Sequence, residues 1–330
     1  MKITIYGAGA VGGLIAARLV QHNGENNQIS IIARGRTLKA IQERGLLISE
    51  QTGTQTVMLE AEADPSRLGV QDIVILAVKS TALADVATRI APLLGPDTLV
   101  VTAMNGVPWW FFECTEGPCS NLRLQSLDPD GLLTRVIPVQ QVIGCVVHLS
   151  SSSPEPATIR PGFGNRLLLG EATTSCQPER LSNIVTLLAT AGFDAQASTD
   201  IRRDIWYKLW GNMTMNPLSA MTGANADKVL DDPLVRDFCL KAMAEAAAIG
   251  SRIGCHIEQS GEERMRLTRQ LGAFKTSMLQ DAEAGRALEI DALVGAVREI
   301  GLKVQVPTPT IDALLGLVRL YARSHALYPQ

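Results

Sequence analysis

Three polar side chains at intervals of four residues are the part of this sequence best suited to chemistry. Lys208, Asn212 and Asn216 lie in the largely apolar stretch DIWYKLWGNMTMNPL, residues 204–218. A step of four residues turns an α-helix by only about 40°, so the three side chains would share one stripe of a helix. A lysine among apolar groups loses hydration and releases its proton more easily, which suits a general acid, and two amides could bind substrate oxygens. The alternative is a solvated stripe. Asparagine is a poor helix former, so two asparagines in register with a lysine are unusual, but the pattern alone does not decide between the two.

A glycine-rich loop near the N-terminus has the spacing of a phosphate-binding loop. Its six residues follow the pattern G-x-G-x-x-G: Gly7, Ala8, Gly9, Ala10, Val11 and Gly12. In such loops the first glycine permits a tight turn, the second lets a pyrophosphate approach, and the third lets the helix pack on the strand. The N-terminus of the following helix would supply unpaired N–H groups for the phosphates. An ordinary glycine-rich turn is the alternative, but the position between a strand and a helix favours dinucleotide binding.

The residues after the second apolar run indicate which dinucleotide the loop would bind. The run ends IIARGR, with Arg34 and Arg36 and no acidic residue. NAD sites usually place Asp or Glu here to accept a hydrogen bond from the ribose 2′-OH, whereas a guanidinium can bind a 2′-phosphate through two hydrogen bonds. We therefore expect NADPH or NADP as the cofactor, with Arg34 as the favoured contact. The alternative is that both arginines are merely solvated.

Further polar residues follow other apolar runs. Lys79 comes after ILAV, and Asn105 comes after VVTAM. Open α/β sheets bind ligands at the carboxyl ends of their strands, so each residue could contact the cofactor, and each could instead be an ordinary turn residue. A later group in the stretch SMLQDAEAGRALEID has no spacing that places it on one surface; its members are Ser277, Asp281, Glu289 and Asp291.

The surrounding chain alternates strands with helices. Runs rich in β-branched residues resemble buried parallel strands; they span residues 2–6, 28–33, 72–78 and 98–103. Helical spacing over residues 10–21 and 80–94 lies between these runs, which predicts a parallel sheet covered on both faces. The segments 46–61 and 157–171 carry glycines between alternating runs, and we predict a hairpin in each.

Helical spacing then continues almost to the end of the chain. We predict an α/β protein with a Rossmann-type dinucleotide-binding domain over residues 1–198 and an all-α domain over residues 199–330. Residues 104–136 are irregular and read as a loop or an inserted excursion. Its aromatic cluster PWWFFE, residues 108–113, either walls a substrate pocket or anchors the excursion.

Composition narrows the class of protein. The chain has 330 residues, 46% of them hydrophobic and 19% charged, and its formal net charge is -3, so neither nucleic acid nor an anionic membrane is an expected partner. No apolar run approaches the roughly 20 residues that span a bilayer, and a strand-like run at residue 2 leaves no room for a signal peptide. The six cysteines show no CxxC pair and the four histidines no ligand-like spacing, so we expect reduced thiols, no metal site and a cytoplasmic protein.

With these motifs in place, the whole chain resembles the ketopantoate reductases (2-dehydropantoate 2-reductases). That resemblance implies an NADPH-dependent enzyme with a Rossmann domain followed by a helical domain. The loop from Gly7 to Gly12 is similar to the cofactor loop of the family. Arg34 falls where the family recognises the 2′-phosphate, while Lys79 in AVKS and Asn105 in MNG match its cofactor-contacting residues.

The substrate side is also similar to the family. IWYKLWGNMTMNPLSA resembles its most specific motif, which implies that Lys208 is the catalytic general acid and that Asn212 and Asn216 bind substrate. SMLQD and EIDAL resemble the segments that hold the substrate carboxylate and a glutamate beside the reaction centre, which implicates Ser277 and Glu289.

Two departures from the family lie on the substrate side. The family commonly has a further substrate-binding asparagine where this chain has Ala226, although Asn225 is adjacent. The stretch from Pro108 to Arg135 is also longer and more aromatic than is usual in the family. The reductase chemistry is therefore better supported than the identity of the oxo acid.

The leading hypothesis is an NADPH-dependent reduction of a 2-oxo acid, foremost 2-dehydropantoate to pantoate, a step of pantothenate biosynthesis. Hydride would reach C2, Lys208 would protonate the oxygen, and Glu289 would orient the lysine or a substrate hydroxyl. The alternatives are a paralogue that reduces another 2-oxo acid and a non-catalytic NADP-binding redox sensor. The long apolar helices could supply an interface, so a homodimer is also left open.

Overall fold

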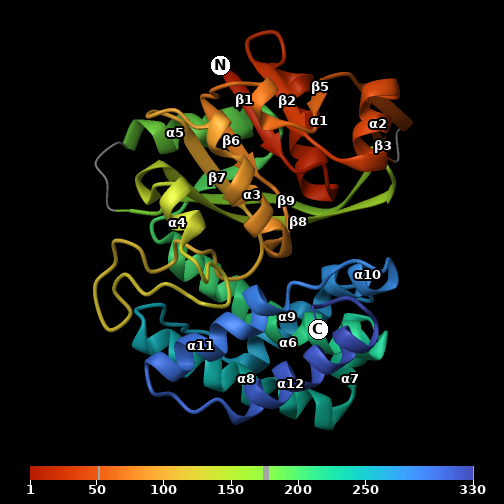
Figure 1. Ribbon diagram of the computed structural model, residues 1–330. Coiled ribbons are helices and arrows are strands. Elements are labelled where there is room, and N and C mark those ends of the chain that lie inside the picture. Colours follow the sequence, from red (N-terminus) through yellow and green to blue (C-terminus); the bar gives the residue numbers. More distant parts are fainter. Residues whose placement is uncertain (51–52, 174–177, 330) are drawn as a thin grey trace. The chain divides into compact units, whose positions relative to one another are not determined.

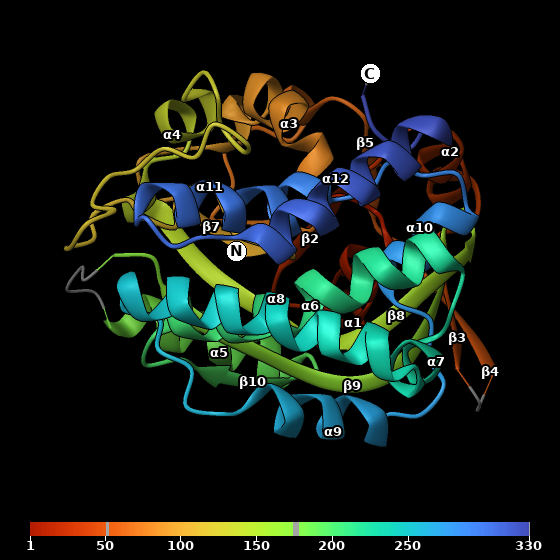
Figure 2. The ribbon, with the colours of Figure 1, turned by 90° about the horizontal axis from the view of Figure 1, so that it is seen from below.

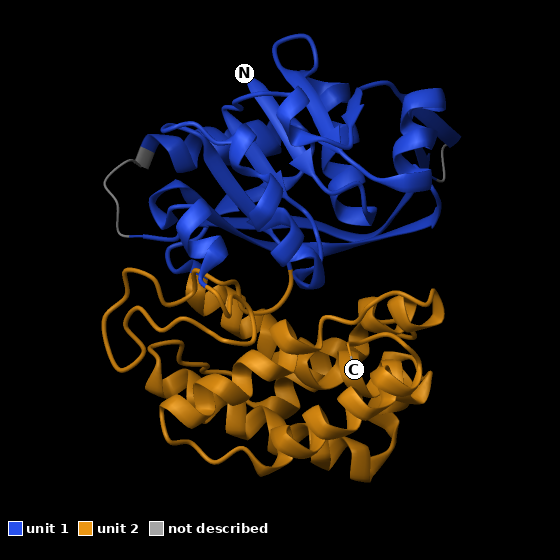
Figure 3. Ribbon diagram, viewed as in Figure 1, with its two compact units in different colours: residues 1–104, 131–201 blue, residues 105–130, 202–330 orange. Residues whose placement is uncertain are grey.

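The chain forms two compact units. The computed structural model describes residues 1–50, 53–173 and 178–329 (Figure 1). The first unit, here called the sheet unit, contains residues 1–104 and 131–201, and the second, the helical unit, contains residues 105–130 and 202–330 (Figure 3). The predicted fold class, a Rossmann-type α/β domain followed by helices, is confirmed.

The single domain boundary predicted between residues 198 and 199 lies close to the crossing at residues 201 and 202. The chain also crosses between the units at 104/105 and at 130/131. The segment 105–130 thus belongs to the helical unit although sheet-unit residues follow it, so a single boundary along the chain cannot separate the two units. Its assignment depends on contacts with residues far along the chain: Phe111 contacts Arg202, 91 positions later, and Ser126 contacts Glu299, 173 positions later.

The sheet unit is built on one mixed sheet. Within the described residues, ten strands pair in the order β4-β3-β9-β8-β7-β6-β1-β2-β5, and β10 pairs with β9. The strands are β1 (Lys2–Tyr6), β2 (Gln28–Ile32), β3 (Leu46–Glu50), β4 (Gly53–Val57), β5 (Glu60–Glu62), β6 (Ile73–Leu76), β7 (Leu99–Ala103), β8 (Val142–Glu155), β9 (Thr158–Glu171) and β10 (Asp194–Ala197). The neighbours β2, β1, β6, β7 and β8 run parallel, as the alternation of strands and helices predicts.

Five of the described α-helices belong to the sheet unit: α1 (Ala10–Asn23), α2 (Gly35–Arg44), α3 (Leu83–Arg89), α4 (Leu132–Val136) and α5 (Pro178–Thr190). Ile3 and Ile5 of β1 pack into one core with Leu14 of α1 and Leu188 of α5. Alternate residues of a strand point to opposite faces, so α1 and α5 cover the face that carries Ile3 and Ile5. Burial on both faces explains why the central strands are continuous apolar runs.

One predicted hairpin is confirmed and the other is wrong. β3 and β4 pair antiparallel, with Leu46 opposite Val57, while residues 51–52 between them lie outside the described residues. The segment 157–171, in contrast, is the single long strand β9, antiparallel to β8. Its glycines mark irregular pairing rather than a turn, because Gly164 has a φ of 81° and the register shifts beside its partner Leu149.

The helical unit contains seven described α-helices and one π-helical turn (Figure 2). The α-helices are α6 (Ile201–Thr222), α7 (Ala226–Asp231), α8 (Pro233–Arg252), α9 (Gly261–Gln270), α10 (Ser277–Glu283), α11 (Ala296–Lys303) and α12 (Pro309–Ser324), and the π turn spans Asp291–Gly295. α8 contacts α7, α9, α11 and α12, and Trp210 of α6 donates a hydrogen bond to the backbone oxygen of Met243 on α8. None of the described helices is both long enough and apolar enough to cross a membrane.

The segment 105–130 packs into the helical unit through its aromatic residues. The side chains of Trp109, Trp110, Phe111 and Phe112 are at most 4% exposed. The ring of Phe111 lies 6.2 Å from that of Trp206 on α6, and Arg202 donates to the backbone oxygen of Phe111 at 2.6 Å. Of the two roles considered for this aromatic cluster, the packing supports the anchor.

The described cysteines are free thiols: Cys114, Cys119, Cys145, Cys239 and Cys255. Cys176 lies outside the described residues. Burial raises the pKa of Cys239 to about 11, so this thiol is protonated near neutral pH and serves as a core residue.

Candidate active site

The glycine loop has the geometry that its sequence pattern predicts. Gly7 has a φ of 115°, and a Cβ there would lie 2.7 Å from the backbone oxygen of Ala77. A Cβ on Gly12 would lie 2.0 Å from the backbone oxygen of Gly7. A side chain is therefore excluded at both positions by the fold itself, the first through the turn and the second through the packing of α1 on the loop.

Gly9 differs from these two glycines because its surroundings are open. A Cβ there would meet no described residue within 4 Å beyond its chain neighbours. Gly9 is the N-cap of α1, and no side chain of the described residues caps this helix. The backbone N–H groups of Ala10 and Val11 start the helix without intrahelical acceptors, as first-turn groups do. This open, positively polarised helix start fits the pyrophosphate of a dinucleotide.

Arg34 lies just past the end of β2, at the N-cap position of α2, where its side chain makes no capping hydrogen bond within the described residues. Its guanidinium forms a hydrogen bond and an ion pair with Asp85 of α3, and the two side chains are 50% and 42% exposed. Burial lowers the pKa of the Arg34 guanidinium, but the hydrogen bond and charge of Asp85 outweigh that effect, so the pKa is raised. Sequence reasoning missed Asp85, since no local pattern connects α3 with a residue 51 positions earlier.

Tyr6 lies at the carboxyl end of β1, next to the end of β2 that precedes Arg34. It is the last residue of β1 and is 2% exposed. Burial raises the pKa of its hydroxyl, and the positive charges of Arg89 and Arg34 oppose the rise. The guanidinium groups of Arg34 and Arg89 and the carboxylate of Asp85 thus all act on the hydroxyl at the carboxyl end of β1.

Lys79 and Asn105 belong to different units. Lys79 is half-buried and is the N-cap of a short 3₁₀ helix, Ser80–Ala82, after β6 of the sheet unit. Asn105 begins the segment that is grouped with the helical unit. Both follow strands of the parallel sheet, as the sequence predicts.

The polar stripe of α6 is present as predicted. Lys208 and Asn212 are half-buried, and Asn216 is only 4% exposed. The Nζ of Lys208 donates a hydrogen bond to Oδ1 of Asn105 at 2.8 Å. Nδ2 of Asn216 has no hydrogen-bond acceptor among the described residues, although it is buried. Because an unmet buried donor is costly, this amide fits an oxygen supplied by a ligand.

The π turn contacts the backbone just after Asn105, and Glu289 lies just before the same turn. Val107 donates its N–H to the backbone oxygen of Ala292 at 2.9 Å, and Gly106, with a φ of 81°, leaves no room for a Cβ against the same oxygen. Glu289, which is 7% exposed, precedes this turn, and its own backbone oxygen accepts from Leu293 at 3.2 Å. π-helical turns are rare and often occur at functional sites.

The C-terminal residues brace the chain on either side of Glu289. Leu288 donates its N–H to the backbone oxygen of Leu327 at 3.0 Å. The hydroxyl of Tyr328 donates to the carboxylate of Asp291, 2.7 and 2.8 Å from its two oxygens. Burial, together with this hydrogen bond and charge of Asp291, raises the pKa of Tyr328. Sequence reasoning missed Tyr328, and its distance along the chain leaves no local signal.

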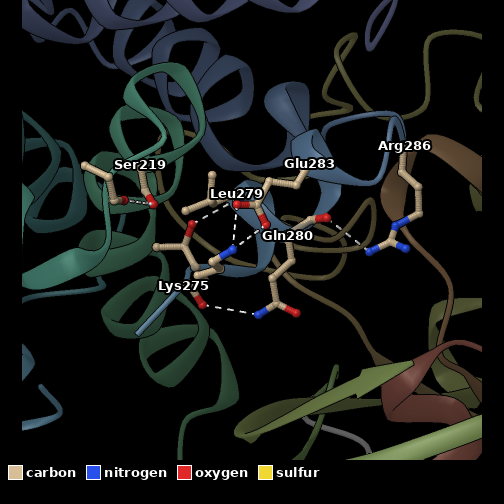
Figure 4. A network of polar contacts seen from close by, with 8 residues as sticks. Ser219, Lys275, Leu279, Gln280, Glu283 and Arg286 are labelled. Atoms are coloured by element: carbon tan, nitrogen blue, oxygen red, sulfur yellow. Dashed lines mark hydrogen bonds and ion pairs between the residues drawn. The ribbon is translucent and has the colours of Figure 1, made fainter. Parts of the chain in front are cut away.

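Ser277 starts α10, and its side chain is exposed. Thr276 caps this helix by accepting the N–H of Leu279 at 3.2 Å, and Lys275 pairs with Glu283 at 2.6 Å (Figure 4). The 8%-exposed carboxylate of Asp281 pairs with Arg286 at 3.0 Å. Asp281 is therefore engaged in holding the segment that leads to Glu289, and Ser277 is the exposed first residue of a helix that Thr276 caps.

Ala226 and Asn225 lie at the start of α7. Ala226 is fully buried at the start of α7, and its N–H donates to the backbone oxygen of Phe274 at 3.0 Å. Asn225 is the half-buried N-cap of α7 and makes no side-chain capping bond within the described part of the chain. The methyl group of Ala226 offers no hydrogen bond at the position where the family that this chain resembles commonly has an asparagine.

Comparison with known proteins gives two family matches and several relatives. Residues 3–109 match the family described as "Ketopantoate reductase PanE/ApbA", and residues 200–322 match "Ketopantoate reductase PanE/ApbA C terminal". A 2-dehydropantoate 2-reductase of Mesorhizobium japonicum is 43% identical over 328 residues, which cover 99% of this chain and all of the relative.

Solved structures agree with these matches. A structure assigned to the ketopantoate reductases, from Ralstonia solanacearum MolK2, is 57% identical, covers 99% of both chains and superposes with a TM-score of 0.93. A D-mandelate dehydrogenase in complex with NADH and anilino(oxo)acetate is 21% identical, covers 99% of this chain and all of the other, and has a TM-score of 0.85. At that identity the second likeness concerns the fold.

Proposed function

The chain belongs to the ketopantoate reductase family, and on this premise we propose that it reduces a 2-oxo acid with NADPH, foremost 2-dehydropantoate to pantoate. Membership makes it an oxidoreductase that uses a nicotinamide dinucleotide. The choice of NADPH, the oxo acid and the roles of single residues are our proposal. The observation that carries it is the hydrogen bond of Lys208 to Asn105, in a stripe that also holds a buried amide donor with no acceptor among the described residues.

Most of the residues that would hold the cofactor are in the sheet unit, and Asn105 is in the helical unit. The open start of α1 behind Gly9 would hold the pyrophosphate, and Arg34 would bind the 2′-phosphate. Lys79 and Asn105 would contact the ribose or the phosphates. When bound, NADPH supplies a hydride to C2 of the oxo acid.

The helical unit would supply the proton and hold the substrate. Lys208 would donate a proton to the carbonyl oxygen as C2 is reduced, which gives a hydroxyl group and leaves a neutral amine. Asn212, Asn216 and Ser277 would donate hydrogen bonds to substrate oxygens. Glu289, fixed by the π turn, would orient the lysine or a substrate hydroxyl.

The direct test follows the loss of NADPH absorbance with 2-dehydropantoate as the substrate. We expect turnover that saturates with the oxo acid, at typical kcat values of about 1–1000 s⁻¹. An absence of turnover at millimolar 2-dehydropantoate would reject that substrate. Tight binding of NADPH without turnover on any oxo acid would instead favour the non-catalytic sensor.

A second candidate is a paralogue that reduces a different 2-oxo acid. The fully buried Ala226, in place of an amide that binds substrate in related enzymes, favours it. A panel of 2-oxo acids ranked by kcat/KM separates the two candidates. The homodimer stays a prediction, which light scattering of the purified protein would measure.

A further inference from the structure

The carboxylate of Asp85 lies beside the guanidinium of Arg34, which would bind the 2′-phosphate of the cofactor. Arg34 ends the loop after β2, where a dinucleotide site distinguishes a ribose hydroxyl from a phosphate. The second strand carries no acid of its own, yet Asp85 of α3 reaches Arg34 and pairs with it. The fold thus supplies from another element the acidic group that the local sequence lacks.

The packing of α3 explains why Asp85 points at this site. Leu83, Val86 and Ala87 are buried beneath the helix, which leaves Asp85 on a half-exposed face with Arg89, four residues later. Arg89 donates to the backbone oxygen of Ala63 at 2.7 Å, so that guanidinium is engaged with the end of β5. Asp85 is therefore placed to act on Arg34.

The pair has different consequences for the two cofactors. A phosphate ester carries about 1.5 to 2 negative charges near pH 7, and a carboxylate next to its binding arginine repels it. Asp85 also occupies donors of Arg34 that a 2′-phosphate needs for bidentate binding. A ribose 2′-hydroxyl carries no charge, and a carboxylate can accept its hydrogen bond.

We propose that Asp85 is a specificity-determining residue, which lowers the preference of this protein for NADPH over NADH by holding Arg34 and by repelling the 2′-phosphate. The inference rests on the proposed function, because Arg34 must face the cofactor. Both members of the pair are partly exposed, so the effect is moderate, and it weakens as salt screens the charges.

The test compares dissociation constants of NADPH and NADH for the full-length protein and its Asp85→Asn variant. We expect the ratio of the NADH to the NADPH constant to rise by about three- to tenfold in the variant. Adenosine 2′,5′-bisphosphate and 5′-AMP, titrated in the same way, isolate the end of the cofactor that Arg34 would contact, and only the bisphosphate should gain affinity.

Asp194→Asn is a matched control. Asp194 pairs with Arg166 at 2.9 Å on strands β10 and β9, with 44% and 54% of the two side chains exposed. This variant also removes one carboxylate from an exposed arginine pair, and it should leave the ratio unchanged.

The possible outcomes separate the two proposals. An unchanged ratio in Asp85→Asn, or an equal loss of affinity for both cofactors, overturns the inference and leaves the proposed function standing. A failure of the unaltered protein to bind either dinucleotide overturns the proposed function itself. A smaller effect at 0.5 M salt than at 0.05 M supports the charge mechanism, and a salt-independent effect contradicts it.

Discussion

Lys208 places an ammonium within 2.8 Å of the Oδ1 of Asn105, on a helix that also buries Trp206, Leu209 and Trp210. A lysine side chain has a flexible four-carbon stem, and a hydrogen bond to a fixed amide restricts it to fewer positions. Asn105 is in turn tied to the π turn through its neighbours Gly106 and Val107. The proton donor of the proposed reaction is thus positioned by backbone contacts from a distant part of the chain.

Replacement of Lys208 by alanine tests its role as the acid. We expect kcat to fall by about 10²- to 10⁴-fold, because the variant lacks the group that protonates the developing alkoxide. The dissociation constant of NADPH should stay within about threefold, since the cofactor loop lies in the sheet unit. Steady-state kinetics and fluorescence titration measure the two quantities.

Lys241→Ala is the control for this substitution. Lys241 is exposed on α8 of the same unit, and its loss should leave kcat unchanged. If Lys208→Ala retained more than a tenth of the original kcat, the assignment of the acid would be wrong.

At the level of the elements, the cofactor loop contains one glycine that the fold requires and another that the proposed cofactor binding requires. Gly12 is enclosed by the backbone of Gly7, whereas the space next to Gly9 is open. A methyl group at position 12 must push the start of α1 away from the loop. A methyl group at position 9 meets no described residue and would fill the space that a pyrophosphate needs.

Gly12→Ala and Gly9→Ala should therefore differ. We expect Gly12→Ala to lower the free energy of unfolding by about 1–3 kcal/mol through overpacking. Gly9→Ala should melt within about 2 °C of the original protein, and its NADPH dissociation constant should rise at least about tenfold. Thermal melts without cofactor and NADPH titrations measure both effects, and the reverse assignment of the two phenotypes would contradict this view of the loop.

The elements that sequence patterns predict here are those with local signals. β1, the glycine loop and α1 are contiguous, and the stripe of α6 follows from helical spacing within one stretch. The sequence predicts a hairpin over residues 157–171 because Gly164 carries a turn-like signal, but this glycine lies within β9, which pairs along its length with β8. A glycine in a long strand reports a distorted pairing, which depends on the partner strand and not on neighbouring residues.

The residues that sequence reasoning missed are joined over long distances. Asp85 meets a residue 51 positions earlier, and Tyr328 meets Asp291, 37 positions earlier. Neither contact has a periodicity, because each arises where separate elements pack together. The roles predicted for Lys208 and Glu289 stay predictions, and the structure adds the contacts that hold each of them.

At the scale of the whole molecule, the chain passes between its two units three times. The glycine loop, Arg34 and Lys79, proposed to bind the cofactor, are in the sheet unit, and the residues proposed for proton transfer and substrate binding are in the helical unit, together with Asn105. Asn105, which follows β7 and receives the hydrogen bond of Lys208, is where the chain first passes from one unit to the other. The proposed reaction therefore requires both units, and neither one carries a complete set of groups.

The transfer of label from cofactor to product is the most direct test of the proposed reaction. NADPH with deuterium at both C4 positions of the nicotinamide is incubated with the protein and 2-dehydropantoate, and the product is analysed by mass spectrometry and NMR. We predict pantoate that carries one deuterium at C2, formed by the original protein and at a rate at least about a hundredfold lower by Lys208→Ala. Pantoate without deuterium at C2, or no pantoate at all, would contradict hydride transfer to that carbon and with it the proposed function.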